Sequence, residues 1–258
     1  MTKTKALVLA IGDSITQQGF STAHSGWVAS LADYYNRFGD VVNRGFSGYN
    51  SRWILEGFDD LIKHDYGDSG NILSHRGVGA DKYLVTLFLG ANDASEDIGA
   101  GGKVGQGVEV DEYEKNINGI LDKLGDAING EMPAERSGAP PPCRIVLITP
   151  GPCDHTKWPT RSDARVSKYA AAIRSIGTAR DLPVVDLWSS EDGVPALDLG
   201  DLEDGLHFNA GGNTKLFQKL QLVLKEHFPH LVPEDDAKGL PMMEMQGPHW
   251  SIFANKDM

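Results

Sequence analysis

Three residues of this sequence, a serine, a histidine and an aspartate, have the types and spacing that nucleophilic catalysis requires. The apolar run "LVLAI" stops abruptly at Gly12-Asp13-Ser14, and "DGLHFN" later carries Asp204 and His207 three residues apart. A serine hydroxyl is a weak nucleophile until a base accepts its proton, and an unperturbed imidazole, with a pKa of about 6.5, suits that role. A neighbouring aspartate holds the tautomer of the imidazole and stabilises the imidazolium. The sequence therefore predicts a triad of Ser14, His207 and Asp204.

Attack by such a serine on an ester carbonyl creates a negatively charged oxygen, which needs hydrogen-bond donors. Two further segments follow apolar runs and offer donors: "NRGFSGYN" contains Gly48, and "GAND" contains Asn92. A glycine suits this place because a side chain would block the acyl group. The predicted oxyanion hole consists of the main-chain amides of Ser14 and Gly48 and the side chain of Asn92.

Each of these residues also has an ordinary structural explanation. Ser14 can cap a helix, Asp204 can cap a helix or a turn, and a lone histidine is more often structural than catalytic. Gly48 can serve only to permit a positive φ, and Asn92 can close a turn through its own side chain. Four polar clusters at one sheet edge are improbable as coincidence, however, and ligands bind at the carboxyl ends of parallel strands. The combination therefore favours catalysis.

The elements that must position these residues alternate along the chain. The strand-length apolar runs are continuous, which is typical of strands buried on both faces, and amphipathic segments of helical period lie between them. This alternation predicts a doubly wound, flavodoxin-like α/β domain, with a five-stranded parallel sheet and helices on both faces. The expected strands are 6–11, 40–43, 83–89, 144–149 and 183–187, and the expected helices are 26–38, 111–128, 162–180 and 213–228.

The expected domain covers residues 1–230, and residues 231–258 form a tail. The tail lacks a clear period but carries a cluster of Met242, Met243, Met245, Trp250 and Phe253, so we expect it to pack on the domain or on a partner subunit. Packing on a partner would make the protein a homo-oligomer. Two segments rich in glycine or proline, 99–107 and 130–142, are predicted to be exposed loops.

Composition and charge limit the kinds of partner that we expect this protein to bind. The chain has 258 residues and a formal net charge of −12, which argues against nucleic acid, since phosphate binding needs a basic patch. No stretch approaches the roughly 20 apolar residues of a membrane helix, so no membrane partner is expected. The two cysteines, Cys143 and Cys153, flank an expected strand about 20 Å long, which is too far for a disulfide. With no export signal visible, we expect a cytoplasmic protein.

The blocks "GDS", "SG", "GAND" and "DGLH" resemble those of the SGNH hydrolases, also called the GDSL family. The resemblance spans residues 12 to 207 and implies that Ser14, Gly48, Asn92 and His207 are its four signature residues. Gly45 is the alternative glycine, but "NRGFSGYN" is similar to the family's N-x-x-x-S-G pattern, which favours Gly48. The first block reads "GDSIT", a variant that leaves the nucleophile unaffected.

Longer segments, including "GWVASLADYY", "FLGANDA" and "LPVVDLW", resemble the isoamyl-acetate-hydrolysing esterases of that family. This implies hydrolysis of small carboxylic esters, typically acetates of short alcohols, without a metal or organic cofactor. Residues 67–82 and 99–107 differ from the sequences of this subgroup. These differences bear on the preferred substrate more than on the mechanism. The same blocks occur in lysophospholipases, thioesterases and carbohydrate acetylesterases, so these activities stay as alternatives within lipid and ester metabolism.

Two hypotheses from other classes compete with a serine esterase. In the first, Asp13, Asn92, Asp93 and His207 bind cations in a metal-dependent phosphoesterase, although the D-x-H ligand pair of such enzymes is missing. In the second, the chain is a catalytically silent binding protein on an esterase fold. An intact nucleophile, base and set of donors argue against the second, because a silent descendant would be free to lose them.

Overall fold

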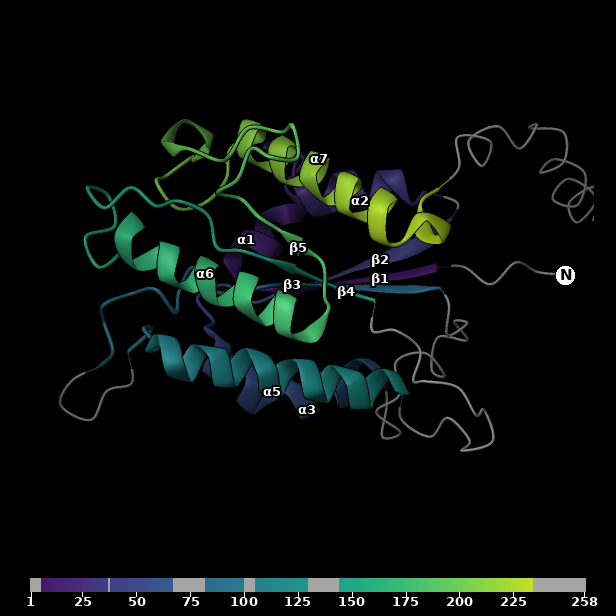
Figure 1. Ribbon diagram of the computed structural model, residues 1–258, viewed down its shortest axis with the longest axis horizontal. Helices are drawn as coiled ribbons and strands as arrows, with labels where there is room; N and C mark the ends of the chain where they lie inside the picture. The colour runs from purple at the N-terminus through teal and green to yellow at the C-terminus, as the bar shows by residue number, and fades with distance from the viewer. Residues whose placement is uncertain (1–5, 37, 67–81, 100–104, 130–143, 234–258) are drawn as a thin grey trace, which may run out of the picture.

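The computed structural model describes residues 6–36, 38–66, 82–99, 105–129 and 144–233. Their centre is a five-stranded parallel sheet in the order β2-β1-β3-β4-β5, as expected for a flavodoxin-like domain (Figure 1). The strands are β1 (Ala6–Gly12), β2 (Gly39–Gly45), β3 (Tyr83–Phe88), β4 (Ile145–Ile148) and β5 (Val184–Val185).

The three strands that carry the first three motifs are neighbours in register. Gly12 at the end of β1 lies opposite Gly45 of β2 on one side and Phe88 of β3 on the other. The segments that leave these three strands therefore start at the same edge of the sheet. This register brings Ser14, Gly48 and Asn92 from distant parts of the sequence to one place.

β2 differs from the expectation that every strand is buried on both faces. Its residues are at most partly buried, whereas every residue of β1 is buried. β2 is the edge strand of the sheet and has a neighbour on one side only. Its short apolar run, Val41-Val42, is consistent with that position.

Helices cover both faces of the sheet, which confirms the doubly wound architecture (Figure 1). Helices α2 and α7 pack together on one face, whereas α3, α5 and α6 lie on the other. The helices are α1 (Ser14–Gln17), α2 (Trp27–Tyr34), α3 (Ser51–Tyr66), α5 (Val110–Asn129), α6 (Asp163–Arg180) and α7 (Ala210–His227).

The sequence analysis did not predict α3. Its apolar side chains Ile54, Phe58 and Ile62 recur every four residues and are buried, so the helical period is present in the sequence. Charged and polar residues occupy many of the positions between them, so the segment does not stand out as apolar. Helix α3 begins six residues after β2 and packs against α5, which fixes the loop that carries Gly48.

Several sequence predictions lie outside the described residues. These include most of the glycine-rich loop 99–107, the part of the tail that begins at residue 234, and Cys143. Cys153 is a buried free thiol. Among the helices that the structure describes, none has the length and apolar character needed to span a membrane.

Candidate active site

Ser14 lies immediately beyond the end of β1, at the first position of α1. Asp13, not Ser14, caps this helix: its Oδ1 accepts a hydrogen bond from the Ile15 amide at 2.9 Å. Residue 12 is a glycine because neighbouring atoms leave no room for a side chain there. A Cβ on Gly12 would lie 2.4 Å from the main-chain oxygen of Phe88. Because Asp13 caps the helix, the Ser14 hydroxyl is free for another partner.

That partner is His207, 193 residues further along the chain. The Nε2 atom of His207 lies 2.9 Å from Ser14 Oγ, and its Nδ1 atom lies 2.7 Å from Asp204 Oδ2. Because an ionised carboxylate only accepts hydrogen bonds, Nδ1 carries the proton and Nε2 is left to accept one from the serine. The contacts have the order expected of a serine, a base and the group that orients the base.

The loop that holds Asp204 and His207 is organised by the carboxylate itself. Asp204 Oδ1 accepts the main-chain amides of Leu206 at 3.0 Å and His207 at 2.9 Å, while Oδ2 accepts the ring. Partial burial by itself would raise the pKa of the Asp204 carboxyl. These hydrogen bonds, led by the one from the His207 ring, outweigh burial and lower the pKa. Asp204 therefore stays ionised beside the imidazole.

The two other predicted oxyanion donors are linked to each other. Asn92 Nδ2 donates to the main-chain oxygen of Tyr49 at 2.8 Å, next to Gly48 in sequence. Gly48 has a φ of +82°, a left-handed conformation that favours glycine, so its conformational explanation also holds. Gly45, the alternative, lies within β2 with its backbone against Gln17. The geometry therefore favours Gly48 over Gly45.

Three residues that the sequence analysis missed connect these parts. Trp158 donates its indole N–H to the main-chain oxygen of Asp204 at 3.1 Å and presents an edge-on ring contact to His207. The guanidinium of Arg161 lies over the Trp158 ring and donates to Asn92 Oδ1 at 3.2 Å. Gln106 accepts from Arg161 at 2.8 Å and belongs to the loop predicted only as glycine-rich. In the sequence, the one indication that Trp158 and Arg161 belong to the site is that their segment follows β4.

Two buried carboxyls behind the site, Asp13 and Asp93, bear on the metal hypothesis. Burial raises the pKa of Asp13 to about 7 and that of Asp93 to about 6. Asp93 Oδ1 accepts the Ser51 amide at 2.9 Å, so both carboxyls cap the starts of helices. Across the described residues, no three His, Cys, Asp or Glu side chains are grouped so that they could hold a metal ion. The donor set of a metal-dependent phosphoesterase is not assembled here.

An apolar groove begins at Tyr49 and follows the outer side of α3. Its volume is about 300 Å³, and Tyr49 joins it to the candidate site, because the Tyr49 carbonyl accepts from Asn92. Phe46, Tyr49 and Trp53 form a row of ring contacts along it, with centroids 5.4 and 5.9 Å apart. The lining residues are Phe46, Tyr49, Trp53, Ile54, Gly57, Asp60, Leu61 and His64.

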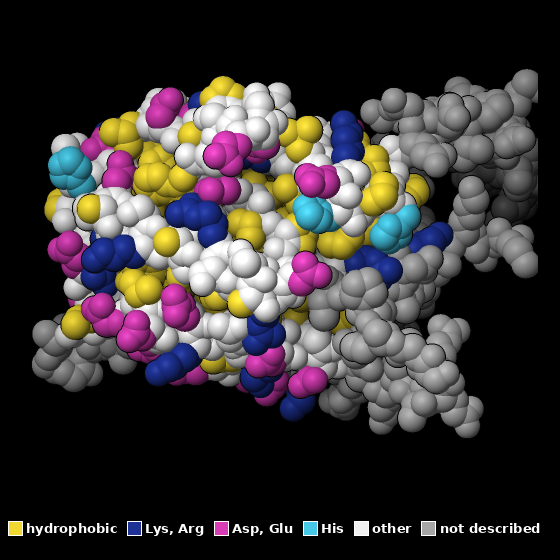
Figure 2. Space-filling view, in the orientation of Figure 1, with side chains coloured by type: hydrophobic (Ala, Val, Ile, Leu, Met, Phe, Trp, Pro, Cys, Tyr) yellow, Lys and Arg dark blue, Asp and Glu magenta, His cyan; other side chains and the backbone are white. Residues whose placement is uncertain are grey.

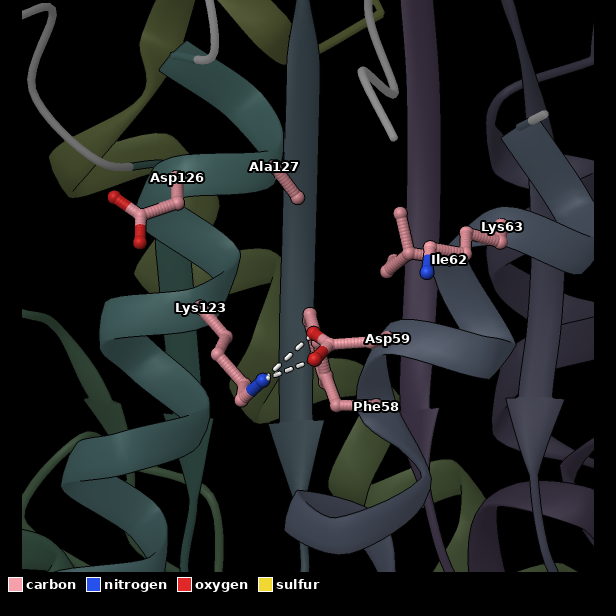
Figure 3. Close-up of a pocket in the computed structure, with 7 residues that line it drawn as sticks. All are labelled: Phe58, Asp59, Ile62, Lys63, Lys123, Asp126 and Ala127. Atoms are coloured by element: carbon pink, nitrogen blue, oxygen red, sulfur yellow. Dashed lines mark hydrogen bonds and ion pairs between the residues drawn. The ribbon is translucent and has the colours of Figure 1, made fainter. Parts of the chain in front are cut away.

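A second pocket, of about 360 Å³, lies between the later turns of α3 and α5 and contains none of the candidate site residues (Figure 3). Lys123 of α5 reaches Asp59 of α3 across it, at 2.6 and 2.7 Å from the two carboxylate oxygens. On the face shown in Figure 2, Lys and Arg side chains are interspersed with Asp and Glu rather than gathered into a basic patch. Neither feature adds chemistry to the site at Ser14.

Comparison with known proteins agrees with this geometry. Residues 10–215 match the GDSL-like lipase/acylhydrolase family, and the chain belongs to that family. The match covers the last three residues of β1, the four other strands and the segments that carry Ser14, Gly48, Asn92, Asp204 and His207. The protein is therefore a carboxylic ester hydrolase.

Curated relatives are similar over nearly the whole chain. A GDSL esterase/lipase of Arabidopsis thaliana is 33% identical over 252 residues, covering 92% of each chain. The human isoamyl acetate-hydrolyzing esterase 1 homolog is 33% identical over 260 residues, covering 93% of this chain and 92% of that one. The isoamyl acetate-hydrolyzing esterase of Saccharomyces cerevisiae is 27% identical and covers 88% of this chain and 89% of its own.

Solved structures share the fold. A lipase/acylhydrolase from Enterococcus faecalis has a TM-score of 0.60 at 23% identity, with 89% of this chain and 98% of that chain covered. An acetylxylan esterase from Geobacillus stearothermophilus has a TM-score of 0.57 at 19% identity, with 86% and 96% covered. At this level of identity the likeness concerns the architecture alone.

Proposed function

We propose that this protein is a serine esterase that hydrolyses small carboxylic esters of the acetate type. The observation that carries the proposal is the position of the His207 ring, which bridges the Ser14 hydroxyl and the Asp204 carboxylate at 2.9 and 2.7 Å. The names of the isoamyl-acetate-hydrolysing relatives support an acetate of a short alcohol as the substrate class.

In the proposed reaction, Ser14 Oγ forms a bond to the ester carbonyl carbon while His207 Nε2 takes the hydroxyl proton. The carbonyl oxygen becomes an oxyanion, to which the amides of Ser14 and Gly48 and the Asn92 side chain donate. Collapse of this intermediate breaks the bond to the alcohol oxygen, which leaves with the proton from His207. The acyl group is then held on Ser14. A water oxygen bonds to the acyl carbon while His207 takes the water proton, and the bond to Ser14 Oγ breaks, which releases the acid while His207 returns the proton to Ser14.

Two measurements test this proposal. A fluorophosphonate should label Ser14 covalently, and the label should be absent from a Ser14→Ala variant. Kinetics with p-nitrophenyl esters of increasing acyl length should show the highest kcat/KM for the acetate or propionate. A protein that neither takes up the label nor hydrolyses any ester would instead fit the silent binding hypothesis.

Activity should also fall as the solution is made acidic, since a protonated imidazole has no lone pair with which to accept the serine proton. A rate that does not fall on acidification would contradict the role of His207 as the base. Retained activity in a chelator would argue against the metal-dependent alternative.

The groove along α3 favours a second candidate, an esterase for longer apolar chains of the lysophospholipase or thioesterase type. The groove begins at Tyr49, beside the proposed donors, and most of its lining side chains are apolar. It offers a path for an alkyl group that extends beyond the reacting carbonyl. The ester series separates the two candidates, because only the second predicts a kcat/KM that rises with acyl length.

Location and assembly stay predictions from the sequence. A cytoplasmic location is tested by cell fractionation, and a homo-oligomer formed through the tail is tested by light scattering on the full chain. The tail lies almost entirely outside the described residues.

A further inference from the structure

Arg161 lies behind the two candidate oxyanion donors and is almost completely buried, with 3% of its surface exposed. Its guanidinium is held at several points at once. Nε donates to the main-chain oxygen of Ala91 at 2.9 Å, and Nη2 donates to Asn92 Oδ1 at 3.2 Å and to Gln106 Oε1 at 2.8 Å. A planar fork fixed by three acceptors has little freedom to rotate.

These contacts determine which way the Asn92 amide faces. A guanidinium offers only donors, so the side-chain oxygen of Asn92 must face Arg161. Its Nδ2 group then faces the opposite way, where it donates one hydrogen to the Tyr49 carbonyl at 2.8 Å. The second hydrogen of Nδ2 is left for an oxyanion. A reversed amide would present an oxygen to the developing negative charge.

Gln106 extends the same control to Gly48. Because its Oε1 accepts from Arg161, its Nε2 faces the other way and donates to the main-chain oxygen of Gly48 at 3.0 Å. Asn50 in turn donates to the main-chain oxygen of Gln106 at 2.8 Å. One guanidinium thus holds Asn92 directly and the backbone of Gly48 through a single amide.

The charge of Arg161 adds to this arrangement. The four acceptors that the guanidinium contacts, two amide side chains, a main-chain oxygen and the Thr160 hydroxyl, are all neutral. Asp13 interacts with this charge electrostatically, but burial disfavours the ionised form of Asp13 and raises its pKa to about 7. A buried cation with neutral hydrogen-bond acceptors favours negative charge appearing nearby, and the tetrahedral intermediate supplies such a charge.

We propose that Arg161 is the positioning residue of the oxyanion hole, which orients Asn92 directly and Gly48 through Gln106. This assignment rests on the proposed esterase function and deepens it, because Arg161 acts through the donors and does not itself touch the substrate.

The test compares Arg161→Met with Arg165→Met. Arg165 is a matched control: it also donates to a main-chain oxygen of the same loop, that of Ala94, and lies over an aromatic ring, but it contacts neither donor. For p-nitrophenyl acetate, Arg161→Met should lower kcat about 10²-fold and change KM less than about three-fold. Arg165→Met should stay within about three-fold of wild type, and Arg161→Lys should fall between the two.

A double-mutant comparison distinguishes positioning from a general structural role. In an Asn92→Ala background, Arg161→Met should cost less than about ten-fold further, since most of its effect passes through Asn92. The affinity for an aryl boronic acid, which forms a tetrahedral adduct on serine, should fall in parallel with kcat/KM. The pH dependence of the rate should be the same in Arg161→Met as in wild type, because the substitution does not remove the contacts between Ser14, His207 and Asp204.

Three results would each overturn the positioning role. The first is a loss in the Asn92→Ala, Arg161→Met double variant equal to the product of the two single losses. The others are an Arg161→Met variant with unimpaired activity and an Arg165→Met variant with an equal loss. If Arg161→Met does not fold, Arg161→Lys and Gln106→Leu carry the same test. Gln106→Leu breaks the link to Gly48 and should lower kcat about ten-fold. A wild-type protein that hydrolyses no ester would overturn the proposed function, and this assignment with it.

Discussion

His207 Nε2 and Ser14 Oγ lie 2.9 Å apart although 193 residues separate them in the sequence. The serine follows β1, an interior strand of the sheet, and the histidine lies in the loop that leads into α7. Asp204 Oδ2 binds the other ring nitrogen of the same imidazole, Nδ1, at 2.7 Å. The proposed chemistry depends on this chain of two hydrogen bonds, and the first prediction tests it directly.

Ser14→Ala and His207→Ala should each reduce kcat by about 10⁴-fold or more, because the nucleophile and its base act as one unit. The double variant should be little worse than either single variant. The measurement is the rate of p-nitrophenyl acetate hydrolysis, with circular dichroism to verify folding. Losses that multiply in the double variant would show that the two residues act separately.

Asn92→Ala should lower kcat by about 10²–10³-fold, the usual loss for one oxyanion donor. KM should change little, since the donor is used mainly when the carbonyl oxygen becomes charged. Steady-state kinetics of the purified variant give both constants. Activity near that of wild type would assign Asn92 to turn formation alone.

Asp13→Asn should make folding less sensitive to pH. Burial raises the pKa of Asp13 to about 7 in the folded protein, so the folded state holds a proton that the unfolded state releases. The contribution of Asp13 to the stability of the wild type therefore falls as the pH rises from about 4 to 7. Asparagine has no proton to lose and still accepts the Ile15 amide, so the variant avoids that loss.

The expected difference in the free energy of unfolding is near zero at pH 4 and on the order of 4 kcal/mol in favour of Asp13→Asn at pH 8. Urea titrations at several pH values measure it. Asp33→Asn, at an exposed position of α2, is the matched control and should show no such trend. A difference between wild type and Asp13→Asn that does not grow over this range would contradict the prediction.

Gly57→Leu tests the groove along α3. An added Cβ at Gly57 meets no atom within 4 Å, and the same is true of Gly125 in α5. Leucine is a better helix former than glycine, so both variants should unfold at higher denaturant, with a gain of up to about 1 kcal/mol each. Only Gly57→Leu places a side chain in the groove.

If the groove receives an alkyl chain, Gly57→Leu should raise KM for octanoate esters about ten-fold and leave acetate unchanged. Gly125→Leu should leave both unchanged. Equal kinetics for the two variants on every ester would remove the groove from the substrate path.

The architecture can be predicted from local patterns, because burial leaves a periodic trace in the sequence. Apolar runs locate the five strands and four of the helices, and the side chains expected to face inward from α5, such as Tyr113, Ile117 and Leu124, are buried. Helix α3 has the same period but escapes prediction, since charged and polar residues separate its apolar ones. The partial exposure of β2 follows from its position at the sheet edge, which depends on strand order.

The sequence by itself determined the types of the reacting groups and the strands they follow. Serine, histidine, aspartate, asparagine and glycine can be read from motifs, since each must have a particular chemistry. The tertiary structure decided that Asp13 caps α1, which leaves Ser14 free, and that Asn92 binds the carbonyl of Tyr49, the residue next to Gly48. It also brought Gln106 into contact with the segment of Trp158 and Arg161, although 55 residues separate Gln106 from Arg161 in the chain. Such residues carry no motif, because their role depends on direction and distance, which only the packed fold specifies.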